Sequence, residues 1–243
     1  MKKQIPNVLT CLNLLSGVIS ITLVMRGNLV AAGLMIFVAA VFDYLDGTMA
    51  RLLDARSELG KQLDSLSDVV SFGVAPGILV FQMISVNCGS CNLLEKFHFA
   101  PYFALLIPVC AALRLAKFNI DIRQEETFYG LPSPANGLFF ASLPLVVFLQ
   151  PNLFSLIRMD FMVEFFSNSR ILAMLAVFFS YLMISDFQIF SMKFKSLKWQ
   201  GNEVRVIFLI CATVMIILFS ISAIPLIILT YLLLSLFFQK KIA

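Results

Sequence analysis

The sequence predicts an all-α protein, a polytopic bundle of apolar helices embedded in a membrane. Hydrophobic residues make up 60% of the 243 residues and charged residues only 13%. The mean hydropathy is +0.94. Apolar runs long enough to cross a bilayer, which takes roughly 20 residues, recur along the chain. Soluble domains carry about 25% charged residues, so the composition excludes that class.

About eight membrane-spanning helices are predicted, and a count of six or seven stays open. The first apolar run follows a short basic N-terminus, but no small-residue cleavage site follows it. We therefore expect it to be retained as a helix rather than removed as a signal peptide. The last apolar run is too long for one crossing, so we divide it at Ser220–Pro225. The predicted spans are 8–25, 29–50, 64–85, 98–118, 134–150, 171–190, 205–221 and 223–238.

Local signals mark where several of these spans begin and end. Asn7 or Thr10 is suited to capping the first span, which ends at Arg26. The fifth span begins after a Gly-Leu-Pro-Ser-Pro turn that starts at Gly130. No linker, repeat or low-complexity segment divides the chain. We expect one domain, 1–243, in which the helices at about 205–238 are an addition to the core of the bundle.

Most of the 18 Lys and Arg residues fall on one side of this eight-span arrangement. Because cytoplasmic loops of membrane proteins carry an excess of basic residues, both termini are expected in the cytoplasm. The expected location is the cytoplasmic membrane. The basic rim also favours anionic membrane lipids over nucleic acid as a partner.

Four aspartates interrupt the apolar pattern between the second and third spans. Asp43 and Asp46 lie at helical spacing on one face near the end of the second span. Asp64 and Asp68 share a face of the third span in the same way. The two pairs are joined by a short basic connector. The sequence therefore predicts a cation site that faces inward between two helices.

Electrostatics favour a bound metal at this cluster. A charged side chain at the bilayer centre costs about 2.5–3.5 kcal/mol, and carboxylates at close range repel each other. A divalent ion removes both penalties, and oxygen ligands favour Mg²⁺ or Mn²⁺, with Ca²⁺ a further candidate. A solvated, helix-capping cluster at the membrane surface is the alternative interpretation.

Small and basic residues beside the acids indicate a phosphate-bearing ligand. Gly47 and Ala50 extend the carboxylate face with almost no side chain, so a flat ligand can approach the backbone, although close helix packing would also use them. Arg51 can offer a bidentate contact to phosphate, and Ser57 a further hydrogen bond.

The acids and their neighbours fit the pattern D-x2-D-G-x2-A-R-x8-G-x3-D-x3-D over residues 43–68. This pattern resembles the signature of the CDP-alcohol phosphotransferases, integral membrane enzymes of phospholipid synthesis. The resemblance implies two divalent ions held by Asp43, Asp46, Asp64 and Asp68, with Asp68 also the general base. It implies that Asn7, Gly47, Ala50, Arg51 and Ser57 bind CDP-diacylglycerol, and it suggests a homodimer.

A second pair of segments narrows the resemblance. The run Leu-Arg-Leu-Ala-Lys-Phe-Asn at 113–119, followed by Gly-Leu-Pro-Ser-Pro-Ala at 130–135, is similar to the phosphatidylserine synthase branch of the family. That branch transfers a phosphatidyl group from CDP-diacylglycerol to L-serine. It makes Arg114 and Ser133 candidates for contacts to serine or phosphate. Simple snorkelling of Arg114 to the membrane interface is the alternative.

Two rival functions remain open at this point. Another acceptor, glycerol 3-phosphate or inositol phosphate, would need a denser basic pocket. A divalent-cation transporter would use the four acids as a translocation site, but it would not need the glycine, alanine and arginine beside them.

Cys88 and Cys91 fall in a predicted outer loop, where a disulfide and a chance pair of cysteines are equally reasonable. The single histidine, His98, also lies outside, which excludes histidine-based catalysis at the cytoplasmic face.

Overall fold

The computed structural model describes residues 4–55, 57–87, 99–120, 128–149, 160–189 and 203–237. Cys88, Cys91 and His98 lie outside the described residues. Within them the chain is almost entirely helical. The α-helices are α1 (Ile5–Met25), α2 (Leu29–Leu52), α3 (Glu58–Asp68), α4 (Ala75–Asn87), α5 (Leu106–Ile120), α6 (Ser133–Leu149), α7 (Asp160–Ser167), α8 (Ser169–Ile184), α9 (Glu203–Phe219) and α10 (Ala223–Phe237).

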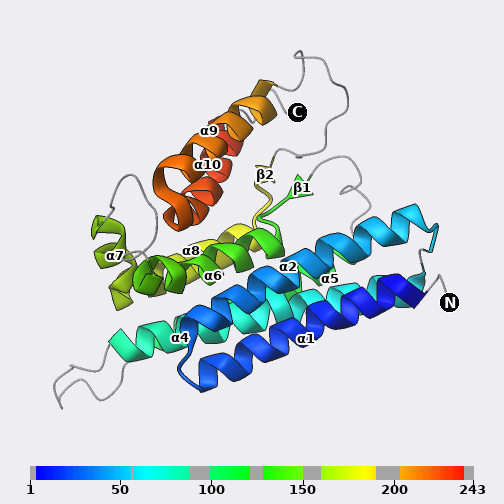
Figure 1. Ribbon diagram of the computed structural model, residues 1–243, viewed down its shortest axis with the longest axis horizontal. Coiled ribbons are helices and arrows are strands. Elements are labelled where there is room, and N and C mark those ends of the chain that lie inside the picture. The colour runs from blue at the N-terminus through cyan, green and yellow to red at the C-terminus, as the bar shows by residue number, and fades with distance from the viewer. Residues whose placement is uncertain are drawn as a thin grey trace.

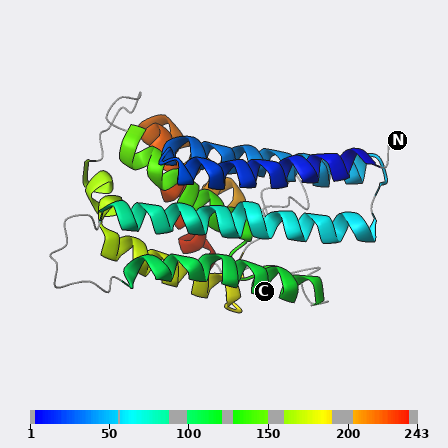
Figure 2. The same ribbon diagram turned by 90° about the horizontal axis from the view of Figure 1, so that it is seen from below.

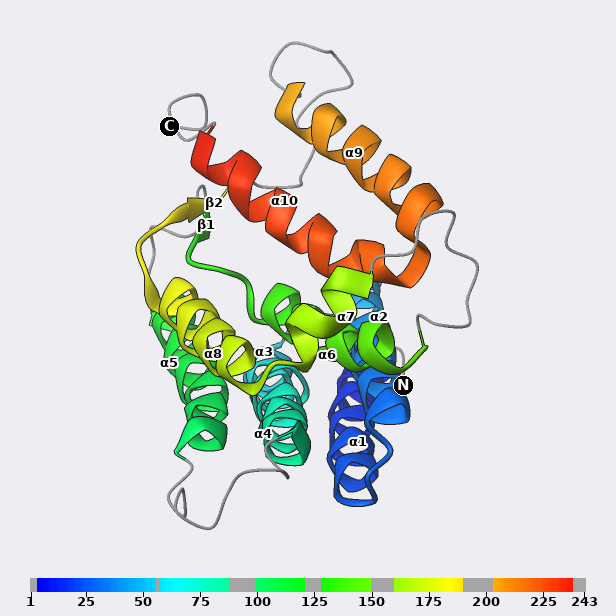
Figure 3. The ribbon, with the colours of Figure 1, turned by 90° about the vertical axis from the view of Figure 1, so that its left-hand side faces the viewer.

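The first five α-helices form the layer that carries the acidic motif. Figure 2 shows α1, α2, the α3–α4 segment and α5 running side by side along the long axis of the molecule. The helices α6 and α8 pack against one side of this layer, and α9 and α10 lie together beyond α6 on that same side (Figures 1 and 3). The buried core is aliphatic and aromatic, with Phe139 and Phe179 stacked at 4.1 Å between ring centroids.

The turn between α1 and α2 forms where the sequence favours one. Gly27 has a φ of +76°, a conformation that glycine adopts without steric cost. Asn28 then caps α2, because its side chain accepts a hydrogen bond from the Ala31 backbone N–H. This short turn returns the chain antiparallel to α1. The acids of α2 therefore lie beside the beginning of α1.

The third predicted span is a single long helical segment with an irregular centre. A π-helical segment, η2 (Val69–Val74), follows directly after Asp68 and joins α3 to α4. Segments of π-helix occur often at functional sites. The glycines of this region serve close packing, since a Cβ added at Gly77 would lie 2.7 Å from Cδ of Pro108 on α5. The whole stretch Glu58–Val86 is apolar and long enough to span a membrane.

Four of the described helical segments are long and apolar enough to cross a membrane: Ile5–Met25, Leu29–Leu52, Glu58–Val86 and Ala100–Ile120. The last of these begins with a 3₁₀ turn, η3 (Ala100–Leu105), before α5. The pair α7 and α8 is bent by 79° and would make a fifth span, whereas α6 and α10 are shorter. Each of the eight predicted segments contains a helix, but in the predicted span 171–190 the helix ends at Ile184 and β2 follows, and α7 lies outside all the predicted spans. The count of eight crossings and the cytoplasmic termini stay predictions.

The predicted break in the last apolar run is confirmed. α9 ends at Phe219, a 3₁₀ turn, η6 (Ser220–Ser222), follows, and α10 begins at Ala223. Ser220 has a φ of +50°, which a continuous α-helix does not allow. The chain therefore reverses here, and α9 and α10 pack against each other.

One small sheet departs from the all-α prediction. The strand β1 (Phe128–Tyr129) pairs antiparallel with β2 (Gln188–Ile189), with Phe128 opposite Ile189. Beside it Gly130 has a φ of +73°, and a Cβ there would lie 2.5 Å from the Met183 carbonyl oxygen. The segment before α6 therefore packs closely against the end of α8. Strands of two residues have too short a pattern for sequence reasoning to detect.

Candidate metal centre and substrate cavity

Three of the four aspartates come together between α2 and α3. Asp43, Asp64 and Asp68 each offer one carboxylate oxygen, and these oxygens all lie within 4.8 Å of one another. Asp68 is buried, with 8% of its surface exposed. This arrangement follows from the helical spacing, since Asp64 and Asp68 are one turn apart on the helix that faces Asp43.

Helix α1 holds the two acidic helices in place. The Ser67 hydroxyl donates a 3.2 Å hydrogen bond to the Thr10 carbonyl, and the Ser71 hydroxyl donates one of 3.0 Å to the Asn13 carbonyl. A Cβ added at Gly17 would lie 2.6 Å from Oγ of Ser71. The absence of a side chain at Gly17 therefore permits the close approach that brings α3 and η2 against α1.

Two polar side chains of α1 contact the acids directly. The Thr10 hydroxyl lies 2.7 Å from Oδ2 of Asp46, to which it donates, and 3.0 Å from the Pro6 carbonyl. The Asn13 Nδ2 donates a 3.3 Å hydrogen bond to Oδ1 of Asp68. Sequence analysis missed both contacts. The available signal was a stripe of small and polar residues that continues through Ser16, Gly17 and Ser20 on the buried face of α1.

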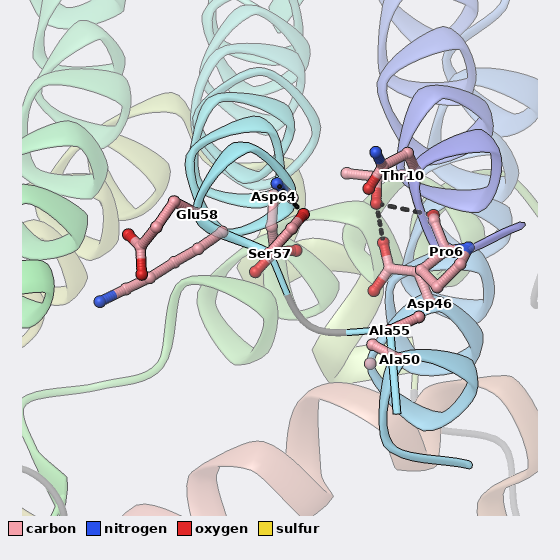
Figure 4. Close-up of a pocket in the computed structure, with 12 residues that line it drawn as sticks. Pro6, Thr10, Asp46, Ala50, Ala55, Ser57, Glu58 and Asp64 are labelled. Carbon is pink, nitrogen blue, oxygen red and sulfur yellow. Dashed lines mark hydrogen bonds between the residues drawn. The ribbon is translucent and has the colours of Figure 1, made fainter. Parts of the chain in front are cut away.

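Asp46 occupies a different position from the other three acids. It is buried and belongs to the wall of an adjacent cavity rather than to the group of three. Asp64 lines the same cavity, so the cavity and the acid cluster are continuous. Figure 4 shows Asp46 and Asp64 on facing helices, with Thr10 bonded to Asp46. The role of Asp46 as a metal ligand stays a prediction.

The cavity has a volume of about 540 Å³ and lies between the start of α1, the end of α2 and the start of α3. Four of the predicted substrate contacts line it: Asn7, Gly47, Ala50 and Ser57. The remaining lining residues, to which sequence analysis assigned no substrate contact, are Pro6, Thr10, Ala55, Glu58, Gly60 and Lys61. Among them Lys61 places a cation at the wall.

The predicted contact Arg51 lies outside this lining. Its side chain is exposed, and its Nε donates a 3.0 Å hydrogen bond to the carbonyl of Gly47 one turn earlier. Ser57 has a structural role as well, because it caps α3 by accepting from the Gly60 backbone N–H at 3.0 Å. Gly60 in turn permits α3 to approach α1, since a Cβ there would lie 3.1 Å from Oδ1 of Asn7.

The two predicted acceptor contacts form a buried pair. Nη1 of Arg114 on α5 donates a 2.9 Å hydrogen bond to Oγ of Ser133 at the start of α6. Arg114 also interacts electrostatically with Asp68 and with Tyr231 of α10. Snorkelling of Arg114 to the interface is therefore wrong, because its side chain is buried beside the acids. Sequence analysis missed Tyr231, whose place near Arg114 depends on the packing of α10 against α6.

The donor set fits a divalent cation. Three carboxylates this close, in a partly buried site, repel one another when ionised, and hard oxygen donors suit a hard divalent ion. The fold and this site together define a class: a helical, membrane-type protein with an acidic, metal-compatible centre beside a cavity large enough for a ligand.

Sequence comparison places the chain within that class. Residues 3–182 match the family described as CDP-alcohol phosphatidyltransferase. The chain therefore belongs to this family of transferases. The match includes the acid cluster, the cavity, Arg114 and Ser133, and it ends before α9 and α10.

Three relatives illustrate the similarity. The CDP-diacylglycerol–serine O-phosphatidyltransferase of Bacillus subtilis is 36% identical over 134 residues, 55% of this chain and 71% of the relative. The enzyme of the same name from Methanocaldococcus jannaschii is 33% identical over 182 residues, 75% of this chain and 71% of the relative. An archaetidylserine synthase of Methanothermobacter thermautotrophicus is 39% identical over 147 residues, 59% of each chain. The chain thus spans less than two thirds of the archaetidylserine synthase.

Proposed function

We propose that this protein transfers the phosphatidyl group of CDP-diacylglycerol to the hydroxyl of L-serine, which yields phosphatidylserine and CMP. The observation that carries the proposal is the group of Asp43, Asp64 and Asp68, which opens into a cavity wide enough for a nucleotide. Family membership supplies the reaction class. The names of the relatives support serine as the acceptor.

The reaction needs a base, a leaving group and charge neutralisation. The serine oxygen attacks the phosphorus that carries diacylglycerol, the bond to the CMP oxygen breaks, and CMP departs with the electron pair. Asp68 accepts the proton of the serine hydroxyl, and Asn13 fixes the orientation of its carboxylate. Two bound Mg²⁺ or Mn²⁺ ions would neutralise the pyrophosphate and stabilise the leaving CMP. Asp43, Asp46, Asp64 and Asp68 would hold them.

The cavity supplies the donor site. Gly47 and Ala50 leave the wall nearly flat, so that the nucleotide can lie against α2, while Asn7 and Ser57 offer hydrogen bonds from the other walls. Lys61 contributes positive charge toward the phosphates. Arg51 is exposed beside this cavity, from where it would reach a phosphate after releasing the Gly47 carbonyl.

The acceptor approaches from the side of Arg114. A buried guanidinium beside Asp68 is suited to the carboxylate of serine, and Ser133 holds it in place. Both substrates then meet at Asp68, between the donor cavity and the arginine. We further propose that the site faces the cytoplasm from the cytoplasmic membrane, as the basic loops predict, and that the protein is a homodimer.

The test uses the purified full-length chain in mixed micelles of detergent and CDP-diacylglycerol. With Mg²⁺ or Mn²⁺ and labelled L-serine we expect phosphatidylserine and CMP in equal amounts, and no product after chelation. Asp68→Asn should lose almost all turnover. Asp54→Asn, in the exposed turn after α2, is the matched control and should retain it. Product from glycerol 3-phosphate or inositol phosphate in place of serine would contradict the proposed acceptor.

A further inference from the structure

A second buried polar group lies next to the Arg114–Ser133 pair, and neither the motif nor the proposed mechanism uses it. Asn136 on α6 is 0% exposed. Both polar atoms of its side chain, Oδ1 and Nδ2, lack a hydrogen-bond partner within the part of the chain that the structure describes. Nε of Arg114 is buried and unpartnered in the same way. Buried amides nearly always have partners, so this one indicates a bound group.

The position of Asn136 follows from the helix that carries it. Asn136 lies three residues after Ser133, so the two side chains are neighbours on one face of α6. Ser133 in turn accepts the hydrogen bond of Arg114. The next residue, Gly137, packs on the π-helical segment that follows Asp68, since a Cβ at Gly137 would lie 3.0 Å from the Phe72 ring. Asn136 is thus close to both the arginine and the π-helical segment that directly follows the proposed base.

We propose that Asn136 recognises the zwitterionic end of the acceptor amino acid, an inference that rests on the proposed function. Its Oδ1 accepts a hydrogen bond from the ammonium group. Its Nδ2 donates to the carboxylate, together with the guanidinium of Arg114. The serine hydroxyl is then left free to reach Asp68.

The chemistry of an amide favours this ligand over a phosphate. A phosphate dianion offers hydrogen-bond acceptors only, so it would satisfy Arg114 and Nδ2 of Asn136 but leave Oδ1 without a donor. An amino acid carries a donor and an acceptor on the same carbon. It therefore satisfies both ends of the amide as well as the arginine. Asn136 accordingly favours an ammonium and a carboxylate on one carbon over a phosphate group at this position.

The experiment compares acceptors in the full-length wild type and in Asn136→Leu, which keeps a similar volume without polar atoms. The acceptors are L-serine, 3-hydroxypropionate, which lacks the ammonium group, and ethanolamine, which lacks the carboxylate. For Asn136→Leu we expect the KM for L-serine to rise roughly tenfold, while the KM for CDP-diacylglycerol changes less than about twofold. The preference of the wild type for L-serine over 3-hydroxypropionate should fall by a similar factor.

Two further variants keep the result interpretable. Ser222→Ala removes another buried, unpartnered hydroxyl, in the turn between α9 and α10, and should leave both KM values unchanged. Asn136→Ala, which cannot clash, replaces the leucine variant if the latter does not fold. An unchanged KM for L-serine in a folded Asn136 variant, or equal increases for both substrates, would overturn the inference.

The failure of the proposed function would be visible separately. A wild type that forms no phosphatidylserine overturns the reaction proposed for the site, whatever the variants do. Equilibrium dialysis of labelled L-serine then tests Asn136 alone. Weaker binding to Asn136→Leu than to the wild type supports the inference, and equal binding or none to either contradicts it.

Discussion

Asn13 and Asp68 lie 55 positions apart in the sequence, yet Nδ2 of Asn13 donates a 3.3 Å hydrogen bond to Oδ1 of Asp68. The contact joins α1 to the last residue of α3, where the regular helix gives way to the π-helical segment. It fixes one oxygen of the proposed base.

Replacement of Asn13 by leucine should therefore slow the chemical step. The backbone carbonyl of Asn13 still accepts from Ser71, so the packing of α1 is retained. We expect kcat for phosphatidylserine formation to fall about tenfold, the lower end of the effect of removing a group that orients a ligand or a base. The KM values for both substrates should change less than about twofold. Thr22→Val, at the exposed far end of α1, is the control, and a wild-type kcat in Asn13→Leu would contradict the assignment.

The contact between Thr10 and Asp46 should control metal affinity. Thr10→Val keeps the shape of the side chain but removes the hydroxyl that donates to Asp46. If Asp46 is a ligand, the Mg²⁺ concentration for half-maximal activity should rise about tenfold. Thr10→Ser should restore the wild-type value, because it keeps the hydroxyl. Equal Mg²⁺ concentrations for half-maximal activity in Thr10→Val and Thr10→Ser would contradict this role of Thr10.

Substitution of Gly47 should weaken ligand binding without lowering the stability of the fold. A Cβ added at Gly47 has no described protein atom within 4 Å, so Gly47→Ala should fold normally. It lines the cavity, however, and a methyl group there would displace a nucleotide that lies against α2. We expect the KM for CDP-diacylglycerol to rise roughly tenfold at an unchanged unfolding temperature.

Gly17→Ala, in contrast to Gly47→Ala, should destabilise the fold. Its Cβ would lie 2.9 Å from the Cα of Ser71, so α1 and η2 would have to separate. Such overpacking costs about 1–3 kcal/mol, and thermal unfolding in detergent should show the loss. Gly47→Ala with wild-type substrate kinetics would argue that the cavity is not the nucleotide site.

Tyr231 connects the C-terminal pair of helices to Arg114, on the side proposed for the acceptor. Its interaction with Arg114 brings α10, which lies beyond the residues matched by the family, to the catalytic core. Tyr231→Phe removes the hydroxyl and should lower kcat/KM for L-serine about fivefold, the effect of roughly 1 kcal/mol. Tyr181→Phe, on the exposed surface of α8, is the matched control. Equal activity of the two variants would mean that α9 and α10 only stabilise the core.

The local features of the site could be predicted because they depend on spacing along one helix. The motif places Asp43 and Asp46 on one helix, and Asp64 and Asp68 one turn apart on another. Runs of apolar residues located the described α-helices other than α7, including the break before α10. Gly47 and Ala50 were selected for their size, and both line the cavity.

Other features depend on contacts between segments that are distant in the sequence. The pattern treated the four acids alike, whereas the structure groups three of them and bonds Asp46 to Thr10. Arg51 was expected in the cavity, but its side chain turns back to the Gly47 carbonyl. No role was predicted for Asn13, Tyr231 or Asn136, because their significance arises from what packs against them.

The sequence by itself determined that acids of two apolar helices must share a site, since helical periodicity and the cost of unneutralised charge in a membrane leave few alternatives. The tertiary structure decided which side chains complete that site. The close approach of α1 at Gly17 places Asn13 beside Asp68, and the packing of α5, α6 and α10 places Arg114, Asn136 and Tyr231 around the proposed acceptor site. Periodicity fixes neighbours within a helix, whereas only packing between helices fixes neighbours across them.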